Sequence, residues 1–380
     1  MKNFSRTLLR WFDKNKRDLP WRETKNPYHV WLSEVILQQT RVAQGMDYYL
    51  KFIARFPTVH DLASADLDEV LKLWQGLGYY SRARNLHTAA KQVVSADRKN
   101  KEGFPCDYEA ILKLKGVGFY TAAAISSICF DAPHAVVDGN VYRVLSRVFG
   151  VHTPIDSTAG KKEFQQLADN LLDKKQPGDY NQALMEFGAI QCTPKNPDCT
   201  NCIFQSDCVA FRTNTVSDLP VKSKKVLQRN RYFYFFILES EGKVNLRQRE
   251  NTKDIWMGLY EFPMIEFSSE QKESAVLRAF QKEFQVIDKK FSVRKISLVQ
   301  THILSHQKLF ARFFHIQLSK ADVKLKSKNI WVKKSAVNSY ALPRLIDKIL
   351  EWLRIGQTQI FNLVSLGKNK KARKNPGFSN

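Results

Sequence analysis

The sequence predicts an all-α region that carries a cysteine-rich loop, followed by a smaller α+β region. In the first half, apolar residues recur at helical spacing, and Gly, Pro or Asp separates one segment from the next. From Arg231 to Leu238, an aromatic and β-branched run is typical of a buried strand. Four of the six cysteines lie between these two regions, within residues 192–208. The change of pattern indicates two domains of different class.

The composition limits the kind of partner. The chain has 380 residues, enough for two or three domains, and a formal net charge of +23. A balance this basic indicates a polyanionic partner, most commonly nucleic acid. No apolar run is long enough to span a bilayer, and no lipidation signal or basic amphipathic helix indicates a lipid surface. The chain opens at Met1 without an apolar signal segment, so we expect a cytoplasmic protein, associated with the nucleoid in a bacterium.

Four helix starts are expected in the first half. Asn26 is a capping residue, and Pro27 follows it as a first-turn proline. Asp66 and Asp107 each precede apolar residues at helical spacing, and another helix follows Gly118. Short helices joined by such turns predict an α domain built by helix packing.

After residue 214 the pattern changes. A polar, basic stretch with Pro220 predicts an interdomain linker. Further strands are expected at 244–249, 309–318 and 330–332, with a helix near 274–284. The expected divisions are a helical domain at 1–214, a linker at 215–230, an α+β domain at 231–355 and a disordered basic tail at 356–380.

The cysteine loop has the spacing C-x6-C-x2-C-x5-C. Four thiolates in one short loop suit a soft-metal site or an iron–sulfur cluster, and ligand number alone does not separate zinc from iron–sulfur. Disulfides are disfavoured by the expected reducing compartment. The candidate ligands are Cys192, Cys199, Cys202 and Cys208, whereas Cys106 and Cys129 show no pattern beyond that of buried thiols.

A glycine hairpin is the first candidate contact with nucleic acid. Gly116 and Gly118 separate the end of one helix from the start of the next, and we expect both to turn the backbone with positive φ. The amides at the start of the next helix then offer a phosphate seat. An ordinary helix–turn–helix corner is the alternative. The basic balance, with Lys113 and Lys115 nearby, favours contact with the DNA backbone.

Two carboxylates are candidates for chemistry. Asp138 precedes a Gly-Asn pair, where a helix cap is the ordinary role of an aspartate. A carboxylate beside a phosphate-binding groove also stabilises positive charge on a sugar whose bond to a base is breaking. Glu34 lies among apolar neighbours that raise the pKa of a carboxyl toward that of an acid catalyst. The alternative for Glu34 is a salt-bridged helix residue, and the sequence does not pair it with Asp138.

Amide and aromatic groups follow in two short segments. Gln38 and Gln39 end one helix, and Tyr79 and Tyr80 follow Gly76-Leu77-Gly78. Such groups can wedge into a base stack, although core packing is the alternative for the tyrosines. Arg82 and Arg84 come next and favour a solvated or phosphate-facing helix.

In this order the motifs resemble those of MutY-type adenine DNA glycosylases. The matching segments are DLPWR from Asp18, SEVILQQTRV, GLGYYSRARNL, LKGVGFYTA, VVDGNVYRVLSR and the cysteine loop, between about Asp13 and Cys208. The resemblance implies a helix–hairpin–helix glycosylase core with a 4Fe–4S cluster. The implied substrate is adenine opposite 8-oxoguanine or guanine in double-stranded DNA, and the protein is expected to act as a monomer. A flipped-out base is required in any case, because a base inside a duplex is out of reach.

The resemblance also implies roles for single residues. Glu34 resembles the acid that protonates the flipped adenine, and Asp138 the carboxylate that stabilises the oxocarbenium ion. Tyr120 stands where endonuclease III-like relatives have the lysine that cuts the strand, which implies a monofunctional glycosylase that leaves an abasic site. The other implied site residues are Asn140 beside the catalytic groups, Trp21 and Arg22 near adenine, and Gln38, Gln39, Leu77 and Tyr79 beside 8-oxoguanine.

The C-terminal region resembles the Nudix-like domain with which this family recognises 8-oxoguanine. Residues 256–263 resemble the approach to a Nudix box. Residues 279–284 read AFQKEF where a Nudix hydrolase has a Glu-rich metal-binding helix, which implies binding without pyrophosphate hydrolysis. Ser305 and His306 resemble recognition residues, whereas Leu304 replaces a phenylalanine.

Two alternatives remain open. A glycosylase for another base, or a glycosylase/lyase, would share the fold, but Tyr120 and the Nudix-like region count against it. A non-catalytic DNA-binding or redox protein would not need Glu34 and Asp138 in their motif positions.

Overall fold

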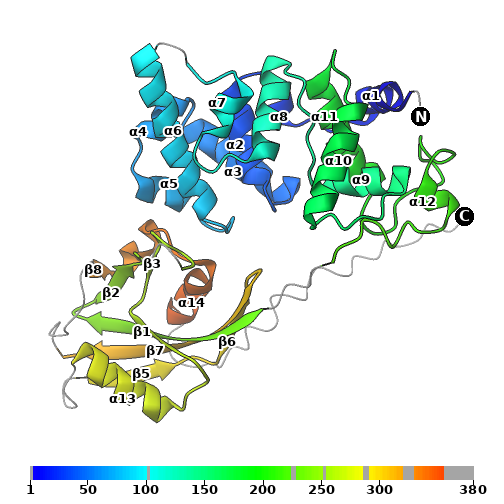
Figure 1. The fold of residues 1–380 in the computed structure, drawn as a ribbon. Coiled ribbons are helices and arrows are strands. Elements are labelled where there is room, and N and C mark those ends of the chain that lie inside the picture. Colours follow the sequence, from blue (N-terminus) through cyan, green and yellow to red (C-terminus); the bar gives the residue numbers. More distant parts are fainter. Residues whose placement is uncertain are drawn as a thin grey trace, which may run out of the picture.

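The computed structural model describes residues 3–100, 103–223, 228–250, 254–285, 291–319 and 329–354. A helical region lies above a region built on one sheet in the view of Figure 1. The predicted fold class, an all-α region followed by a smaller α+β region, is confirmed. The basic tail expected at 356–380 lies outside the described residues.

The helical region follows the expected pattern of short helices and polar caps. Asn26 accepts a hydrogen bond from the Tyr28 amide, and Asp107 accepts one from the Ala110 amide. Asp66 is the N-cap of its helix without a side-chain bond. The helices are α1 (Phe4–Asn15), α2 (Pro27–Leu37), α3 (Val42–Arg55), α4 (Val59–Ser64), α5 (Leu67–Leu73), α6 (Ser81–Asn100), α7 (Tyr108–Leu112), α8 (Phe119–Phe130), α9 (Gly139–Phe149), α10 (Thr158–Leu171), α11 (Pro177–Glu186) and α12 (Val209–Arg212).

These helices contribute to two large cores and to a smaller cluster between α2 and α8. One core contains the buried faces of α2 to α8, with Trp31, Phe52 and Trp74 among its largest side chains. The other joins α1 to α9, α10 and α11 through residues such as Phe164 and Phe187. Figure 1 shows the two groups side by side. A pocket can therefore form at the seam between them.

The predicted hairpin lies between α7 and α8. Gly116 has a φ of 79°, and a Cβ there would come within 2.5 Å of the Asn85 side chain, so glycine is required. Gly118 is different from expectation, because it is the extended N-cap of α8 with a φ of −105°. The expectation of positive φ is thus correct for Gly116 and wrong for Gly118. One left-handed residue is enough to reverse the chain here.

The C-terminal region is a mixed sheet between two helices. Its long central strands β1 (Arg229–Ser240) and β7 (Gln307–Leu318) run parallel to each other, and the other pairings are antiparallel. Helix α13 (Glu273–Phe284) packs on the face that carries Tyr234 and Phe236. Helix α14 (Arg344–Arg354) packs on the opposite face. The remaining strands are β2 (Lys243–Gln248), β3 (Tyr260–Glu261), β4 (Met264–Phe267), β5 (Phe291–Ile296), β6 (Gln300–Ile303) and β8 (Asn329–Lys333).

The expected linker divides into two parts. Val216, Leu219 and Val221 pack against the second helical core, and the Ile155 amide donates to the Val221 carbonyl at 3.1 Å. Residues 224–227 lie outside the described part of the chain. Among the described helices, none is long and apolar enough to cross a membrane.

Candidate active site

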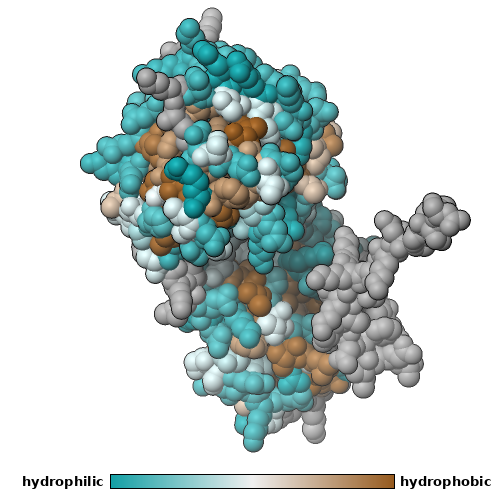
Figure 2. Space-filling view, turned by 90° about the vertical axis from the view of Figure 1, so that its right-hand side faces the viewer, coloured by the Kyte–Doolittle hydropathy of each residue, from teal (hydrophilic) through white to brown (hydrophobic). Residues whose placement is uncertain are grey.

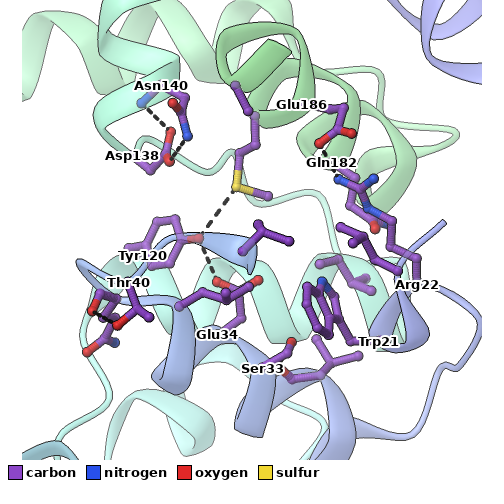
Figure 3. Close-up of a pocket in the computed structure, with 18 of the residues that line it drawn as sticks. Trp21, Arg22, Ser33, Glu34, Thr40, Tyr120, Asp138, Asn140, Gln182 and Glu186 are labelled. Carbon is purple, nitrogen blue, oxygen red and sulfur yellow. Dashed lines mark hydrogen bonds and ion pairs between the residues drawn. The ribbon is translucent and has the colours of Figure 1, made fainter. Parts of the chain in front are cut away.

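A cavity of about 480 Å³ lies at the seam between the two helical cores. Helix α2 forms one wall with Glu34, and α8 contributes Tyr120 beside it. The N-cap of α9 presents Asp138 from the other side, and α11 contributes Met185 (Figure 3). The structure therefore brings together residues that lie more than a hundred positions apart in the sequence.

Glu34 has the environment of an acid catalyst. Burial raises the pKa of its carboxyl to about 7, and the charge of Asp138 adds to the rise. The Tyr120 hydroxyl donates a hydrogen bond of 2.5 Å to Glu34 Oε2, which lowers the pKa and limits the shift. The pKa of Tyr120 itself is raised well above its usual value by burial and by Glu34, so it remains a donor. Glu34 can hold a proton near neutral pH and release it to a ligand.

Asp138 caps α9, as expected, and its carboxylate also lines the pocket. Its Oδ1 caps α9 by accepting from the amides of Asn140 and Val141, each at 2.8 Å. Its Oδ2 accepts from Asn140 Nδ2 at 2.8 Å. Burial raises the pKa of Asp138, and these three donors oppose the rise by favouring the charged form. The result is a fixed carboxylate in the pocket wall, suited to stabilise a developing positive charge.

A third carboxylate, which is buried, organises the opposite end of the pocket. Glu186 pairs with Arg17 at 2.6 Å and with Arg22 at 2.8 Å. Burial works against ionisation, yet the hydrogen bonds from both arginines hold the pKa of Glu186 at about 2. Trp21 lines the same end of the pocket and is buried. This ionised group anchors the segment that carries Trp21 and Arg22.

Sequence reasoning missed four residues of this wall. Arg17 immediately precedes the DLPWR motif. The other three lie on one face of α11, and their helical spacing is the sequence pattern that could have identified them. They are Gln182, Met185 and Glu186.

The predicted wedge residues occupy different environments. Gln38 and Gln39 line the pocket at the end of α2. Tyr79 is 46% exposed, and its hydroxyl is hydrogen-bonded to that of Ser305 from the C-terminal region. Leu77 is 7% exposed and belongs to the first core, as packing alone would require. The exposed groups are therefore the better candidates for contact with a base stack.

The hairpin and the recognition loop are both open to solvent. Gly116, Gly118 and the neighbouring Lys113 and Lys115 are exposed, away from the pocket lining. His306 is exposed between β6 and β7, and its carbonyl accepts from the Arg229 amide. These groups are accessible to a large ligand.

The four cysteines line one small cavity together with Arg147. Arg147 Nη1 lies 3.5 Å from Cys192 Sγ, and the Phe204 amide donates to Cys202 Sγ at 3.4 Å. All four thiols are free of disulfides. Within the described residues, no group of three or more His, Cys, Asp or Glu side chains is arranged to hold a single metal ion. The thiols surround a space and do not converge on one point.

Helix α9 connects this loop to the pocket. Arg143 donates to the Cys192 carbonyl at 2.8 Å and to Asn140 Oδ1 at 2.9 Å. One turn later, Arg147 donates to the Thr193 carbonyl at 2.8 Å. These contacts tie the cysteine loop to α9, the helix whose N-cap is Asp138.

The face of the molecule that Figure 2 shows has apolar surface among hydrophilic surface. Two apolar side chains near the cysteines are more than one third exposed: Ile203 in the loop and Phe211 in α12.

Comparison with known proteins assigns the family. Residues 32–171 match the model of the HhH-GPD superfamily base excision DNA repair proteins, and residues 233–352 match a NUDIX domain. A solved thermostable thymine-DNA glycosylase superposes with a TM-score of 0.50 at 31% identity, over 56% of this chain and 96% of that one. The first region therefore has the fold of the HhH-GPD superfamily of base excision DNA repair proteins, and the second has that of a NUDIX domain.

Two adenine DNA glycosylases refine the assignment. The one from Arabidopsis thaliana is 39% identical over 71% of this chain, and the match spans about half (48%) of that longer protein. The one from Buchnera aphidicola subsp. Baizongia pistaciae is 33% identical over 91% of this chain and 95% of its own length. The chain belongs to the adenine DNA glycosylase family.

Proposed function

We propose that this protein hydrolyses the N-glycosidic bond of adenine paired with 8-oxoguanine or guanine in duplex DNA. The observation that carries the proposal is the pairing of Glu34 with Asp138 across one pocket. One carboxyl has a pKa of about 7, and the other is held by three donors that favour its charged form. Two carboxyl groups with different environments are what acid-assisted glycoside hydrolysis requires.

The chemistry divides between these groups. Glu34 donates its proton to N7 of the flipped adenine, and the bond between C1′ and N9 breaks as adenine leaves with the bonding electrons. Asp138 stabilises the positive sugar that remains. Water then attacks C1′, and the Glu34 carboxylate accepts its proton. The net change is one water consumed, one adenine released and one abasic site formed.

The same pocket supports a monofunctional reaction. A lyase needs an amine to attack C1′, and the corresponding hairpin position holds Tyr120, whose hydroxyl is hydrogen-bonded to Glu34. The described lining contains Arg17 and Arg22 but no lysine, and Glu186 holds both arginines. We therefore expect abasic sites without strand cutting.

Recognition of the opposite base is assigned to the surface shared by the two regions. Tyr79 and Ser305 are exposed neighbours from the helical and C-terminal regions. An aromatic ring can fill the space that a flipped base leaves, and a hydroxyl can hydrogen-bond a modified base edge. His306 adds a second exposed polar group in the same loop. We assign contact with 8-oxoguanine to these groups, with Gln38 and Gln39 on the pocket side.

The cysteine cavity fits a 4Fe–4S cluster. Thiols that surround a space suit a polynuclear cluster, and hydrogen bonds to the sulfurs are a feature of such sites. Cys192, Cys199, Cys202 and Cys208 would hold the cluster, which supplies a rigid tie for the loop against α9. Substituting Cys199→Ser is expected to reduce bound iron and DNA affinity together. Full retention of both, measured by iron analysis and by titration with duplex, would contradict this role.

The decisive experiment is a single-turnover assay on a duplex with one adenine opposite 8-oxoguanine, analysed with and without alkali. We expect cleavage of the adenine strand only after alkali, and none from Glu34→Gln. Glu69→Gln, which changes an exposed ion pair with Arg55, is the matched control and should retain activity. Cleavage without alkali would indicate a lyase, and tight binding without product would indicate a non-catalytic DNA-binding protein.

A further inference from the structure

Arg82 lies in the first turn of α6 and joins two separate turns of the chain. Its side chain is buried, with 9% exposure, so the expected solvated or phosphate-facing position is wrong for this residue. Nη1 donates to the carbonyls of Val35 and Gln38, at 2.8 and 2.6 Å, at the end of α2. Nη2 donates to the carbonyls of Leu77 and Gly78, at 3.4 and 3.3 Å, just before Tyr79. One guanidinium thus holds the helix of Glu34 and the loop of Tyr79.

The environment of Arg82 is unusual for a buried cation. No carboxylate of the described residues pairs with it, and its Nε is without a hydrogen-bond partner there. Its guanidinium carbon lies 5.0 Å from the centre of the Trp74 ring and 5.8 Å from that of Tyr79. Burial lowers its pKa to about 10, so it remains charged at neutral pH. The negative end of the α2 dipole and the two aromatic faces supply the compensation.

Both turns that Arg82 holds are conformationally demanding. Gln39 has a φ of 56° and Tyr79 a φ of 46°, in the left-handed region that non-glycine residues rarely occupy. Each such residue persists only when its surroundings determine it. Arg82 donates to the carbonyl of Gln38, which precedes Gln39, and to the carbonyl of Gly78, which precedes Tyr79. It therefore fixes the peptide group directly before each left-handed residue.

The Tyr79 turn is also where the C-terminal region meets the helical region. The Tyr79 hydroxyl contacts Ser305, and Gln75 Oε1 accepts from the Leu342 amide at 3.2 Å. Arg84, two residues after Arg82, donates to the Met257 carbonyl at 2.7 Å. On the other side of Arg82, Glu34 precedes Gln38 by one helical turn. A contiguous path of contacts therefore connects the proposed recognition loop to the acid.

We propose that Arg82 is a positioning residue that couples contact with the base opposite adenine to the placement of Glu34. The inference rests on the proposed function and goes beyond it by assigning the coupling to one side chain. With Arg82 in place, the Tyr79 turn and the end of α2 move as one unit. Without Arg82, each turn relaxes independently, and contact with the opposite base no longer affects the position of Glu34.

The test compares two substrates within each protein preparation. Single-turnover excision rates are measured at saturating enzyme for adenine opposite 8-oxoguanine and opposite guanine. The ratio of the two rates is independent of the active fraction, so loss of folded protein does not change it. We expect Arg82→Met to lower the ratio at least fivefold. We expect Arg82→Lys to lower it at least threefold, because one ammonium cannot reach both turns.

The matched control is Phe164→Leu, a destabilising change in the other helical core that does not contact Arg82. It should leave the ratio unchanged. If Arg82→Met does not fold, Arg82→Lys decides alone. A ratio within twofold of the wild-type value in the decisive variant would overturn the coupling and leave Arg82 a structural cap. A wild-type ratio of one would overturn it as well, whereas absence of adenine release from the wild type would refute the proposed function itself.

Discussion

The Glu34 carboxyl lies in a wall of apolar side chains, and burial raises its pKa to about 7. In the unfolded chain the same group titrates near 4.5, so the folded state binds the additional proton between these values. The free energy of unfolding therefore falls as pH rises from about 4.5 to about 7. The burial that raises the pKa of Glu34 therefore also lowers the free energy of unfolding above neutral pH.

This cost leads to a first prediction. Glu34→Gln cannot ionise, so it should be more stable than the wild type by about 3 kcal/mol at pH 8 and by only about 1 kcal/mol at pH 5.5. Urea unfolding at the two pH values measures the difference. A difference that is the same at both values would show that ionisation of Glu34 is not its source.

A second prediction concerns Tyr120. Its hydroxyl donates to Glu34 and lowers the pKa of that carboxyl, so Tyr120→Phe should raise it further. The decline of the single-turnover rate with increasing pH should then move to higher pH. We also expect a rate about 10-fold lower at neutral pH, because the acid holds its proton more tightly and loses its positioning contact. An unshifted pH–rate profile would exclude this hydrogen bond as the control on Glu34.

At the scale of elements, α9 unites the cap, the site and the cysteine loop. Asp138 is both the N-cap of this helix and a carboxylate in the pocket wall. Arg143 and Arg147, one turn apart on its buried face, hold the backbone of the cysteine loop. A substitution of Asp138 therefore changes both the helix cap, which affects the free energy of unfolding, and the charge in the pocket, which affects adenine excision.

Two substitutions of Asp138 separate the effect of the helix cap from the effect of the charge. Serine is also a favourable N-cap, so Asp138→Ser should keep the free energy of unfolding within about 0.5 kcal/mol, whereas Asp138→Ala should lose about 1 kcal/mol. Both remove the carboxylate, and both should lose adenine excision. Thermal unfolding and single-turnover assays on the pair provide the measurement. Activity in the serine variant would show that the charge of Asp138 is dispensable.

At the scale of the molecule, the net charge of +23 sets the expected response to salt. Phosphate contacts release counterions, so the affinity for duplex DNA should fall at least about 100-fold between 50 and 200 mM salt. Titration of the Glu34→Gln variant with a mismatched duplex measures this without turnover. A shift of less than about threefold would indicate that few phosphates are contacted.

Local features of the sequence were sufficient for much of the fold. The caps at Asn26 and Asp107 form as expected, because they depend on residues two or three positions away. The long strands β1 and β7 were also expected, since an apolar run of that length has few alternatives. The short strands β3 to β6 and helix α14 were not expected. Their hydrophobic patterns are too short, or too similar to the pattern of the flanking residues, to be recognised.

The sequence by itself determined the class of the two regions, the cysteine loop and the identity of Glu34, Asp138 and Tyr120 as candidates. Only the tertiary structure decided that α2, α8 and the cap of α9 meet in one pocket, which Glu186 and Arg17 complete. It also decided that Arg82 joins the turns of Gln39 and Tyr79. The physical reason is range. Periodicity and capping report on neighbours a few residues apart, whereas the pKa of Glu34 and the partners of Arg82 depend on side chains brought together by packing.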